Sequence, residues 1–291
     1  MGKFVKRIYL FATVAKLIAY FLIYQFIFTI AGQYIAYLLY KTAVEPVTYN
    51  EFVLQTTAQA TQYKANGMAT GILLSSLIMI AHLLVFKYVR INKGFLHEVK
   101  RNVLIFSTLF IGSMMVLFNI VAVWLGLGDY NEEIIETMLT SGAGIISMAI
   151  IAPILEELLF RGAIQGFLMH IFKNPWVGIV IASLLFGVIH GNPIQIFYAT
   201  CIGIGFGWIY YRTGSLLLVI VGHMLNNTIA TLTMLTMSNV DEKAASNASS
   251  GYVAFALFAA ISIMLVIKLN RSLPPVPVPW HESDEPDEVI G

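Results

Sequence analysis

The sequence has few charged residues and only one cysteine, and both shortages narrow the class of protein. Charged side chains make up 11% of the 291 residues, against about 25% in a soluble globular domain. The formal net charge is +1, so no extended basic surface is predicted and nucleic acid is not expected as a partner. The single cysteine, Cys201, excludes an intramolecular disulfide and a cysteine-rich metal site. The low charge is instead typical of an integral membrane protein.

Hydrophobic residues account for 58% of the chain, and they gather in runs close to the ~20 residues needed to cross a bilayer. The first run continues far beyond the ~7–15 apolar residues of a signal peptide, so we interpret it as a retained transmembrane helix. The predicted fold is therefore an all-α polytopic membrane protein with about eight transmembrane helices. The predicted spans are residues 8–40, 68–89, 103–127, 144–171, 176–190, 194–211, 215–236 and 251–267.

The distribution of Lys and Arg over the predicted loops indicates an orientation. Cytoplasmic loops carry an excess of these residues. With the N-terminus inside, twelve of them lie in inner segments and three in outer segments, which predicts a multi-pass protein of the cell membrane with both termini cytoplasmic. The twelve are Lys3, Lys6, Arg7, Lys87, Arg90, Lys93, Lys100, Arg101, Lys173, Arg212, Lys268 and Arg271; the three are Lys41, Lys64 and Lys243.

The chain divides into four predicted regions. Residues 1–143 hold the first three transmembrane helices with their loops, and residues 144–236 hold a core of four helices. Residues 237–271 hold an outer loop and the last helix. Residues 272–291 form a Pro-rich acidic tail, for which disorder in the cytoplasm is expected.

Two acidic residues lie inside the predicted spans, in the stretch "APILEELLFRG" (residues 152–162). A charged side chain at mid-membrane costs about 2.5–3.5 kcal/mol, so such residues face a protein interior or a cavity. Glu157 and Arg161 are four residues apart with the acid N-terminal, a favourable arrangement for an ion pair. Glu156 points about 100° away and has no partner on its own helix. An ion pair beside a protonated glutamate would explain these charges by structure alone, whereas a free Glu156 would explain them by function.

Two further predicted spans carry polar side chains of the types used in catalysis. "FGVIH" places His190 on one span, and "GHMLNNT" places His223 and Asn227 four residues apart on another. A lone histidine in an apolar helix is more often a satisfied core residue, and we interpret His82 in this way; His170 is interpreted as interfacial. If the helices of Glu156, His190 and His223 pack together, their side chains form one polar pocket.

A carboxylate beside imidazole groups is suited to activating water as a general base. The remaining His and Asn side chains can donate hydrogen bonds to a developing oxyanion. Alternatively, Glu156, His190 and His223 can bind Zn²⁺ with one position left open for water. Both routes lead to hydrolysis of an acyl bond, most plausibly a peptide bond.

The stretches "EELLFR", "FGVIH" and "HMLNN" resemble the three motifs EExxxR, FxxxH and HxxxN of the CPBP family. That family comprises type II CAAX prenyl endopeptidases and bacteriocin-processing or immunity-type intramembrane proteases. The matching motifs lie within residues 144–236, in the family's order and on separate predicted spans. The resemblance implies an intramembrane, CAAX-protease-like endopeptidase that acts on a membrane-associated protein or peptide in the lipid bilayer.

The resemblance also implies roles for individual residues. Glu156 would activate the catalytic water together with His190, and Phe186 would shape the wall of the site. Glu157 and Arg161 would hold the helix and position the site.

His223 and Asn227 would support the tetrahedral intermediate. Family members are described as metalloproteases or as metal-free glutamate proteases, so the expected cofactor is either none or Zn²⁺. The sequence lacks the signature of two His residues on one helix that zincins carry, which favours the metal-free mechanism.

Two other functions are compatible with the same residues. A non-catalytic immunity or scaffold protein could keep the fold without using Glu156. A proton-coupled transporter could use Glu156 and the histidines as a relay, but the sequence shows no internal repeat of the kind that such carriers have. The oligomeric state is not predicted.

Overall fold

A computed structural model describes residues 3–89, 99–127, 132–237 and 248–273, and every regular element in these ranges is a helix. The prediction of an all-α polytopic protein is therefore confirmed, whereas most of the predicted acidic tail, from residue 274 onward, lies outside the described residues. The elements are α1 Lys3–Ala43, α2 Tyr49–Leu54, α3 Ala58–Val85, α4 Arg101–Trp124, α5 Glu132–Leu139, α6 Gly142–Ile146, η1 Ser147–Ile151, α7 Ala152–Glu157, η2 Leu158–Gln165, α8 Gly166–Phe172, α9 Pro175–Val188, α10 Pro193–Thr213, α11 Leu216–Met237 and α12 Ala248–Ser272.

Seven helices among the described residues are long and apolar enough to cross a membrane. The elements from α6 to α8 form one of them, a continuous helix of 31 residues over Gly142–Phe172. The remaining predicted span, 176–190, corresponds to α9, whose 14 residues fall short of the ~20 that cross the hydrocarbon. The eight predicted spans are thus found as seven long helices and one short one. The second long helix begins at Ala58, ten residues earlier than the prediction placed it.

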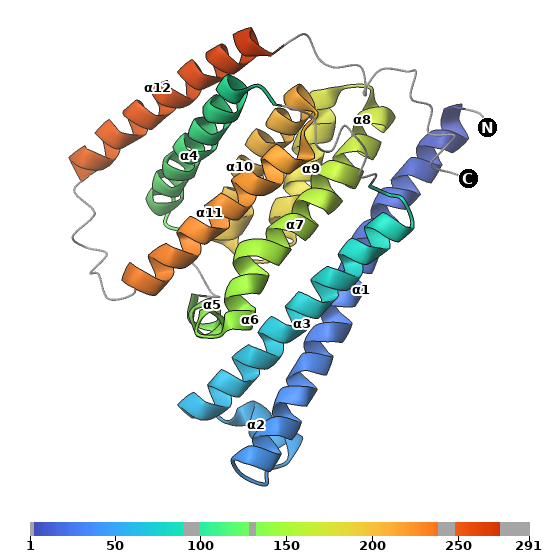
Figure 1. Cartoon of the computed structure of the whole chain (residues 1–291), viewed down its shortest axis with the longest axis vertical. Helices are drawn as coiled ribbons and strands as arrows, with labels where there is room; N and C mark the ends of the chain where they lie inside the picture. The colour runs from blue at the N-terminus through green and yellow to red at the C-terminus, as the bar shows by residue number, and fades with distance from the viewer. Residues whose placement is uncertain (1–2, 90–98, 128–131, 238–247, 274–291) are drawn as a thin grey trace.

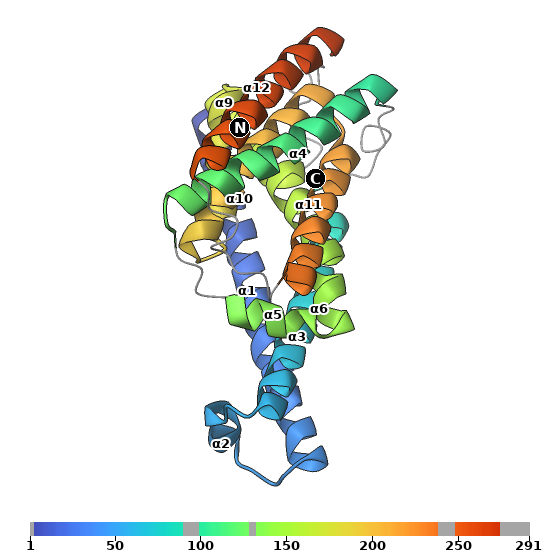
Figure 2. The same ribbon diagram turned by 90° about the vertical axis from the view of Figure 1, so that its left-hand side faces the viewer.

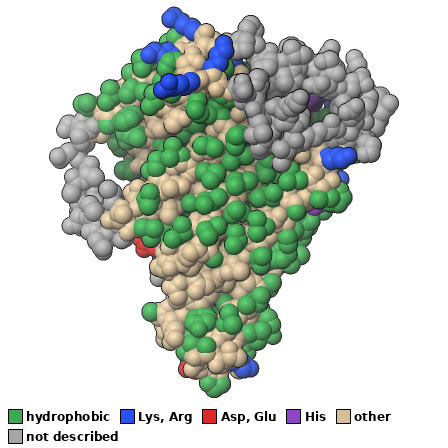
Figure 3. All heavy atoms as spheres, in the orientation of Figure 1, with side chains coloured by type: hydrophobic (Ala, Val, Ile, Leu, Met, Phe, Trp, Pro, Cys, Tyr) green, Lys and Arg blue, Asp and Glu red, His purple; other side chains and the backbone are tan. Residues whose placement is uncertain are grey.

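The long helices are arranged as two outer pairs around a central group (Figures 1 and 2). α1 packs along α3 on one side, and α4 packs along α12 on the other. Between them lie the Gly142–Phe172 helix and α9, α10 and α11, with α11 against both α7 and η1. The space-filling view in Figure 3 shows hydrophobic side chains over most of the visible face, with Lys and Arg mainly toward its upper end. This distribution fits a protein surrounded by lipid.

The α1–α3 pair is held by close contact between the two backbones. A Cβ atom added at Gly67 would lie 2.6 Å from the carbonyl oxygen of Gly32 and 2.7 Å from the Cβ of Ala36. A Cβ at Gly71 would lie 2.5 Å from the carbonyl oxygen of Phe28. Small residues four positions apart let transmembrane helices approach closely in this way. At the far end of the pair, the short helix α2 closes the hairpin (Figure 2).

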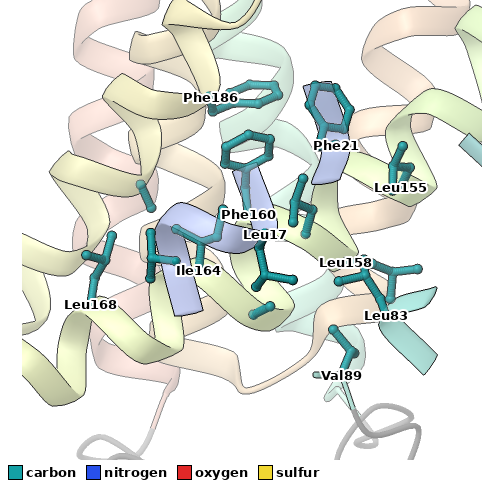
Figure 4. Packing of buried hydrophobic residues seen from close by; sticks show 14 of the residues in the cluster. Leu17, Phe21, Leu83, Val89, Leu155, Leu158, Phe160, Ile164, Leu168 and Phe186 are labelled. Atoms are coloured by element: carbon teal, nitrogen blue, oxygen red, sulfur yellow. The ribbon is translucent and has the colours of Figure 1, made fainter. Parts of the chain in front are cut away.

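A hydrophobic cluster fixes the position of the central helix. Leu17 of α1 and Leu83 of α3 are fully buried against Leu158, Phe160 and Ile164 of η2. These side chains point toward one another from different helices in Figure 4. The cluster therefore anchors the helix that carries Glu156 and Arg161 against the α1–α3 pair.

Candidate functional site

Residues of all three motifs come together inside the central group of helices. Glu156 and Glu157 end the helix α7, and His223 and Asn227 lie on α11, which packs against it. His190 directly follows Ile189, the C-cap residue of α9. Glu157 is fully buried, whereas the side chain of Glu156 keeps 16% of its surface exposed. The two neighbouring carboxyl groups therefore sit in different environments.

Glu157 lies at the centre of the polar contacts. Its Oε1 accepts a hydrogen bond of 2.8 Å from Nη1 of Arg161, so the predicted ion pair forms. The same oxygen lies 2.8 Å from Nδ1 of His223, a contact that the sequence interpretation missed. Because a carboxylate only accepts hydrogen bonds, Nδ1 carries the proton. Glu157 thus fixes both the orientation and the tautomer of the His223 ring.

Arg161 is enclosed by helix η2, α9 and α10, and only 1% of its surface is exposed. Its Nη2 donates to the carbonyl oxygen of Gly203 at 3.1 Å. The guanidinium lies over the ring of Phe186, 4.5 Å from its centroid, and 5.6 Å from that of Phe206. An arginine can stack on aromatic rings and pair with a carboxylate at once. Arg161 therefore joins its own helix to α9 and α10, and Glu157 extends this network to His223 on α11.

Glu156 faces the other nitrogen of His223. Its Oε2 lies 3.6 Å from Nε2, so the carboxylate that lacks a partner on its own helix has an imidazole opposite it. With the Nδ1 proton directed to Glu157, a neutral ring presents a lone pair at Nε2. Two acceptors facing each other at this separation require a proton on one of them or a bridging water.

His190 and His223 contact the same aromatic ring. The ring centroids of Phe186 and His190 are 5.1 Å apart, and those of Phe186 and His223 are 5.8 Å apart, both edge-to-face. Nδ1 of His190 donates to the carbonyl oxygen of Phe186 at 2.8 Å. This leaves Nε2 of His190 as the group that can act on a ligand, and no described residue bonds it.

The positions of Glu156, His190 and His223 show whether these three residues fit the predicted Zn²⁺ site. No three His, Cys, Asp or Glu side chains in the part of the chain that the structure describes are grouped closely enough to hold a metal ion. Glu156 and His223 face each other, whereas the contacts of His190 are with the ring and the carbonyl oxygen of Phe186. The predicted ligand set of Glu156, His190 and His223 therefore does not fit a three-ligand zinc site as these residues are placed.

Asn227 compensates for a proline in the helix opposite. Pro153 has no N–H to donate, and it lies directly after a π-helical turn in which the N–H of Ala152 bonds to the carbonyl of Ser147. The next donor in this i→i+5 pattern would be residue 153, bonding to the carbonyl of Met148. Nδ2 of Asn227 supplies that missing hydrogen bond, at 3.0 Å.

Sequence reasoning missed several residues that support the site. Nε2 of Gln165 donates to the carbonyl oxygen of Gly207 at 3.0 Å, one turn beyond the contact between Arg161 and Gly203. The sequence spacing could have revealed the contact of Gln165 with Gly207. Gln165 lies four residues after Arg161, and Gly207 lies four residues after Gly203. Sequence reasoning also overlooked Asn226, although its side-chain amide directly precedes that of Asn227 in the sequence.

Two further histidines, His82 and His170, lie among the described residues. Nδ1 of His82 and the hydroxyl of Tyr24 are 2.9 Å apart, so His82 is a hydrogen-bonded residue between α1 and α3. Nδ1 of His170 donates to the carbonyl of Gly166 at 2.9 Å. Cys201 is a free, half-buried thiol. None of these three residues contacts the side chains of the motifs.

Comparison with known proteins assigns the segment that carries this site. Residues 139–229 match the family model Rce1-like, described as "Type II CAAX prenyl endopeptidase Rce1-like". A Bacillus subtilis (strain 168) protein named "Putative membrane peptidase YdiL" is 30% identical over 113 residues, which are 38% of this chain and 46% of that protein. The matched part thus spans less than half of that relative. No solved structure matches this chain. All of the predicted site residues lie within the matched segment. The similarity of residues 139–229 to this endopeptidase family, and of the chain to the Bacillus subtilis protein, supports the CPBP family that the three motifs predict.

Proposed function

We propose that this protein is an intramembrane endopeptidase that hydrolyses a peptide bond in a membrane-associated protein or peptide. The observation that carries the proposal is the arrangement of Glu156 opposite Nε2 of His223, whose ring is held by Glu157. The match of residues 139–229 to an endopeptidase family supports it independently. A buried, hydrogen-bonded imidazole beside a partly exposed carboxylate is an arrangement that can activate water.

In the proposed reaction, the Glu156 carboxylate takes a proton from a water molecule held between its Oε2 and the imidazole of His223. The resulting hydroxide attacks the carbonyl carbon of the scissile peptide bond, and the carbonyl electron pair moves to oxygen. Glu156 then returns the proton to the leaving nitrogen as the C–N bond breaks. The products are a carboxylic acid and an amine. His190 is proposed to hold the same water through Nε2, because hydrogen bonds to a shared water span a wider gap than bonds to a shared zinc ion.

The oxyanion of the tetrahedral intermediate requires hydrogen-bond donors that are already in place. A proton on Nε2 lets His223 donate to it, and Asn227 has a second amide hydrogen beyond the one used on Met148. Glu157 and Arg161 contribute by keeping the imidazole in one orientation. Fixed donors of this kind cost no reorganisation during the reaction, which is the reason that they accelerate it.

The test is cleavage of a quenched fluorescent membrane-peptide library by purified full-length protein in lipid nanodiscs. We expect Glu156→Gln to lower kcat/KM by about 10²–10⁴-fold, the usual contribution of a general base. The matched control is Glu136→Gln, which alters an exposed carboxyl on α5 and should leave cleavage unchanged. Cleavage by Glu156→Gln at the wild-type rate would contradict the proposed role of this residue.

A chelator arm decides between the two mechanisms. Activity that persists in a strong chelator fits the metal-free reaction described above. Activity that is lost in the chelator and restored by Zn²⁺ would instead show that the helices rearrange to bring His190 to Glu156 and His223. If no peptide is cleaved and cells carrying Glu156→Gln behave as wild type, the protein acts as a non-catalytic scaffold.

A further inference from the structure

A row of three side-chain hydrogen bonds ends at the carbonyl that Pro153 leaves without a backbone donor. The hydroxyl of Tyr198 donates to Oδ1 of Asn226 at 2.9 Å. Nδ2 of Asn226 donates to Oδ1 of Asn227 at 2.9 Å, and Nδ2 of Asn227 donates to the carbonyl oxygen of Met148 at 3.0 Å. The row joins α10, α11 and η1 beside the site.

The donor and acceptor of every hydrogen bond in the row are determined by its last acceptor, the carbonyl oxygen of Met148. A backbone carbonyl can only accept a hydrogen bond, so Asn227 must turn its amide nitrogen toward Met148 and its oxygen toward Asn226. Asn226 must then present its own nitrogen to that oxygen, and its Oδ1 needs a donor. The Tyr198 hydroxyl is the group that supplies this donor.

We propose that Tyr198 and Asn226 are positioning residues that keep the amide nitrogen of Asn227 on the side of the site. The proposal rests on the peptidase function, in which the second hydrogen of this nitrogen contacts the oxyanion. If the amide of Asn227 were reversed, its oxygen would face both the carbonyl of Met148 and the developing negative charge. Both contacts would be repulsive, so the row fixes the donor in its productive orientation before substrate arrives.

Two substitutions interrupt the row at different points. Asn226→Asp keeps the shape but replaces the donor by an acceptor, so it favours the reversed orientation of Asn227. We expect kcat to fall about 100-fold, close to the 10²–10³-fold loss caused by removing an oxyanion donor. Tyr198→Phe removes only the first donor, and we expect a fall of about tenfold.

In both variants KM should change by less than about twofold, because the lost interaction acts on the transition state rather than on substrate binding. The matched control is Tyr211→Phe on the same helix, whose hydroxyl has no hydrogen-bond partner among the described residues; it should retain wild-type kcat. A parallel rise in KM, or wild-type kcat in Tyr198→Phe and Asn226→Asp, would overturn the positioning role while leaving the peptidase function intact.

A second measurement tests the row without any substrate. Tyr198 and Asn227 are not hydrogen-bonded to each other, so their effects on Tm couple only if Asn226 connects them. We expect Tyr198→Phe to lower Tm in the wild-type background, and to lower it by less than half as much in the Asn227→Ala background, where Asn226 is free to turn. Additive shifts in Tm would show that the row does not act as a unit, even if the wild-type protein cleaves no peptide.

Discussion

Two helix contacts in this molecule are built on glycines four residues apart, and they use those glycines for opposite purposes. In the α1–α3 pair, Gly67 and Gly71 bring the backbone of α3 directly against the backbone of α1. Gly67 lies against Gly32. In the contact between η2 and α10, Gly203 and Gly207 instead leave room for long polar side chains that bond to their carbonyl oxygens. The first arrangement leaves no room for a side chain between the two backbones at the glycines, and the second places polar side chains there.

The difference shows what a pair of small residues means in a membrane protein. Lipid gives no hydrophobic driving force between helices, so close packing and interhelical hydrogen bonds must hold them together. The α1–α3 pair relies on packing at its glycines, and its interhelical hydrogen bonds lie elsewhere along the pair, from Nε2 of Gln33 to the carbonyl oxygen of Lys64 and between Tyr24 and His82. The contact of Arg161 and Gln165 with α10 relies on hydrogen bonds, and these also hold the site in place.

The largest effect is expected when the charged group of the contact between η2 and α10, the guanidinium of Arg161, is removed. Arg161→Met leaves Glu157 buried without its cation, which typically costs about 3–5 kcal/mol, and it frees the ring of His223 to turn. We expect a loss of that size in chemical unfolding of the protein in bicelles, together with loss of peptide cleavage. Arg161→Lys should recover little, because a lysine cannot bond to Glu157 and Gly203 with the same planar fork.

Breaking the packing contact should affect stability without affecting the site. Gly67→Ala places a Cβ 2.6 Å from the carbonyl oxygen of Gly32, so the two backbones must separate. We expect a cost of about 1–3 kcal/mol in the same unfolding assay and an unchanged kcat for the folded protein. Gly112→Ala on α4 is the matched control, because nothing lies within 4 Å of its added Cβ. A kcat that falls with Gly67→Ala would show that the two contacts are not independent.

A smaller effect is expected at the second glycine of the polar contact. In Gly207→Ala the new Cβ would lie 2.6 Å from Oε1 of Gln165, so this side chain must turn and lose its bond to the carbonyl. We expect a loss of about 1 kcal/mol. Adding Gln165→Leu to Gly207→Ala should cost less than the sum of the two single changes. Additive costs would mean that Gln165 does not bond to α10.

The smallest effect is expected at the end of the α1–α3 pair where α2 joins the two helices. The pKa of the Glu51 carboxyl is held below its ordinary value, mainly by the hydrogen bond from the backbone N–H of Thr48. The hydroxyl of Thr48 makes a smaller contribution in the same direction. Because the folded-state pKa is lowered, this carboxylate stabilises α2 above the unfolded-state pKa of about 4.3, and the contribution is lost as pH falls through the folded-state value. Glu51→Gln should therefore speed amide exchange in Tyr49–Leu54 slightly at neutral pH. Equal exchange in the two proteins would contradict the capping role.

The helices and the main polar residues follow directly from the sequence, because apolar runs and polar exceptions are both visible there. The ion pair between Glu157 and Arg161 was predictable from their spacing on one helix. The bond between Glu157 and His223 was not, because periodicity indicates which face a residue occupies and not which distant helix covers that face.

The π-helical turns explain most of what remained hidden. Nothing in the apolar pattern distinguishes the i→i+5 turns of η1 and η2 from α-helix. The need for Asn227 to bond to Met148 becomes apparent only when the turn before Pro153 is known. The proline itself was visible in the sequence, and a buried proline inside a span indicates that some carbonyl requires a donor from elsewhere.

The π-helical turn η2 also sets how this helix responds to changes in length. A π turn accommodates one residue more than an α turn, since its hydrogen bonds close at i→i+5. Deleting one residue from Leu158–Gln165 would let the helix continue as a regular α-helix, and the later side chains would keep their directions, because the turn would lose only its extra residue. In a helix that was α-helical throughout, the same deletion would carry every later side chain about 100° around the axis. Leu168 and Ile171, which are buried, would then rotate away from the interior. The phase of the helix beyond the site is therefore insensitive to the loss of one residue within this turn and sensitive to such a loss elsewhere.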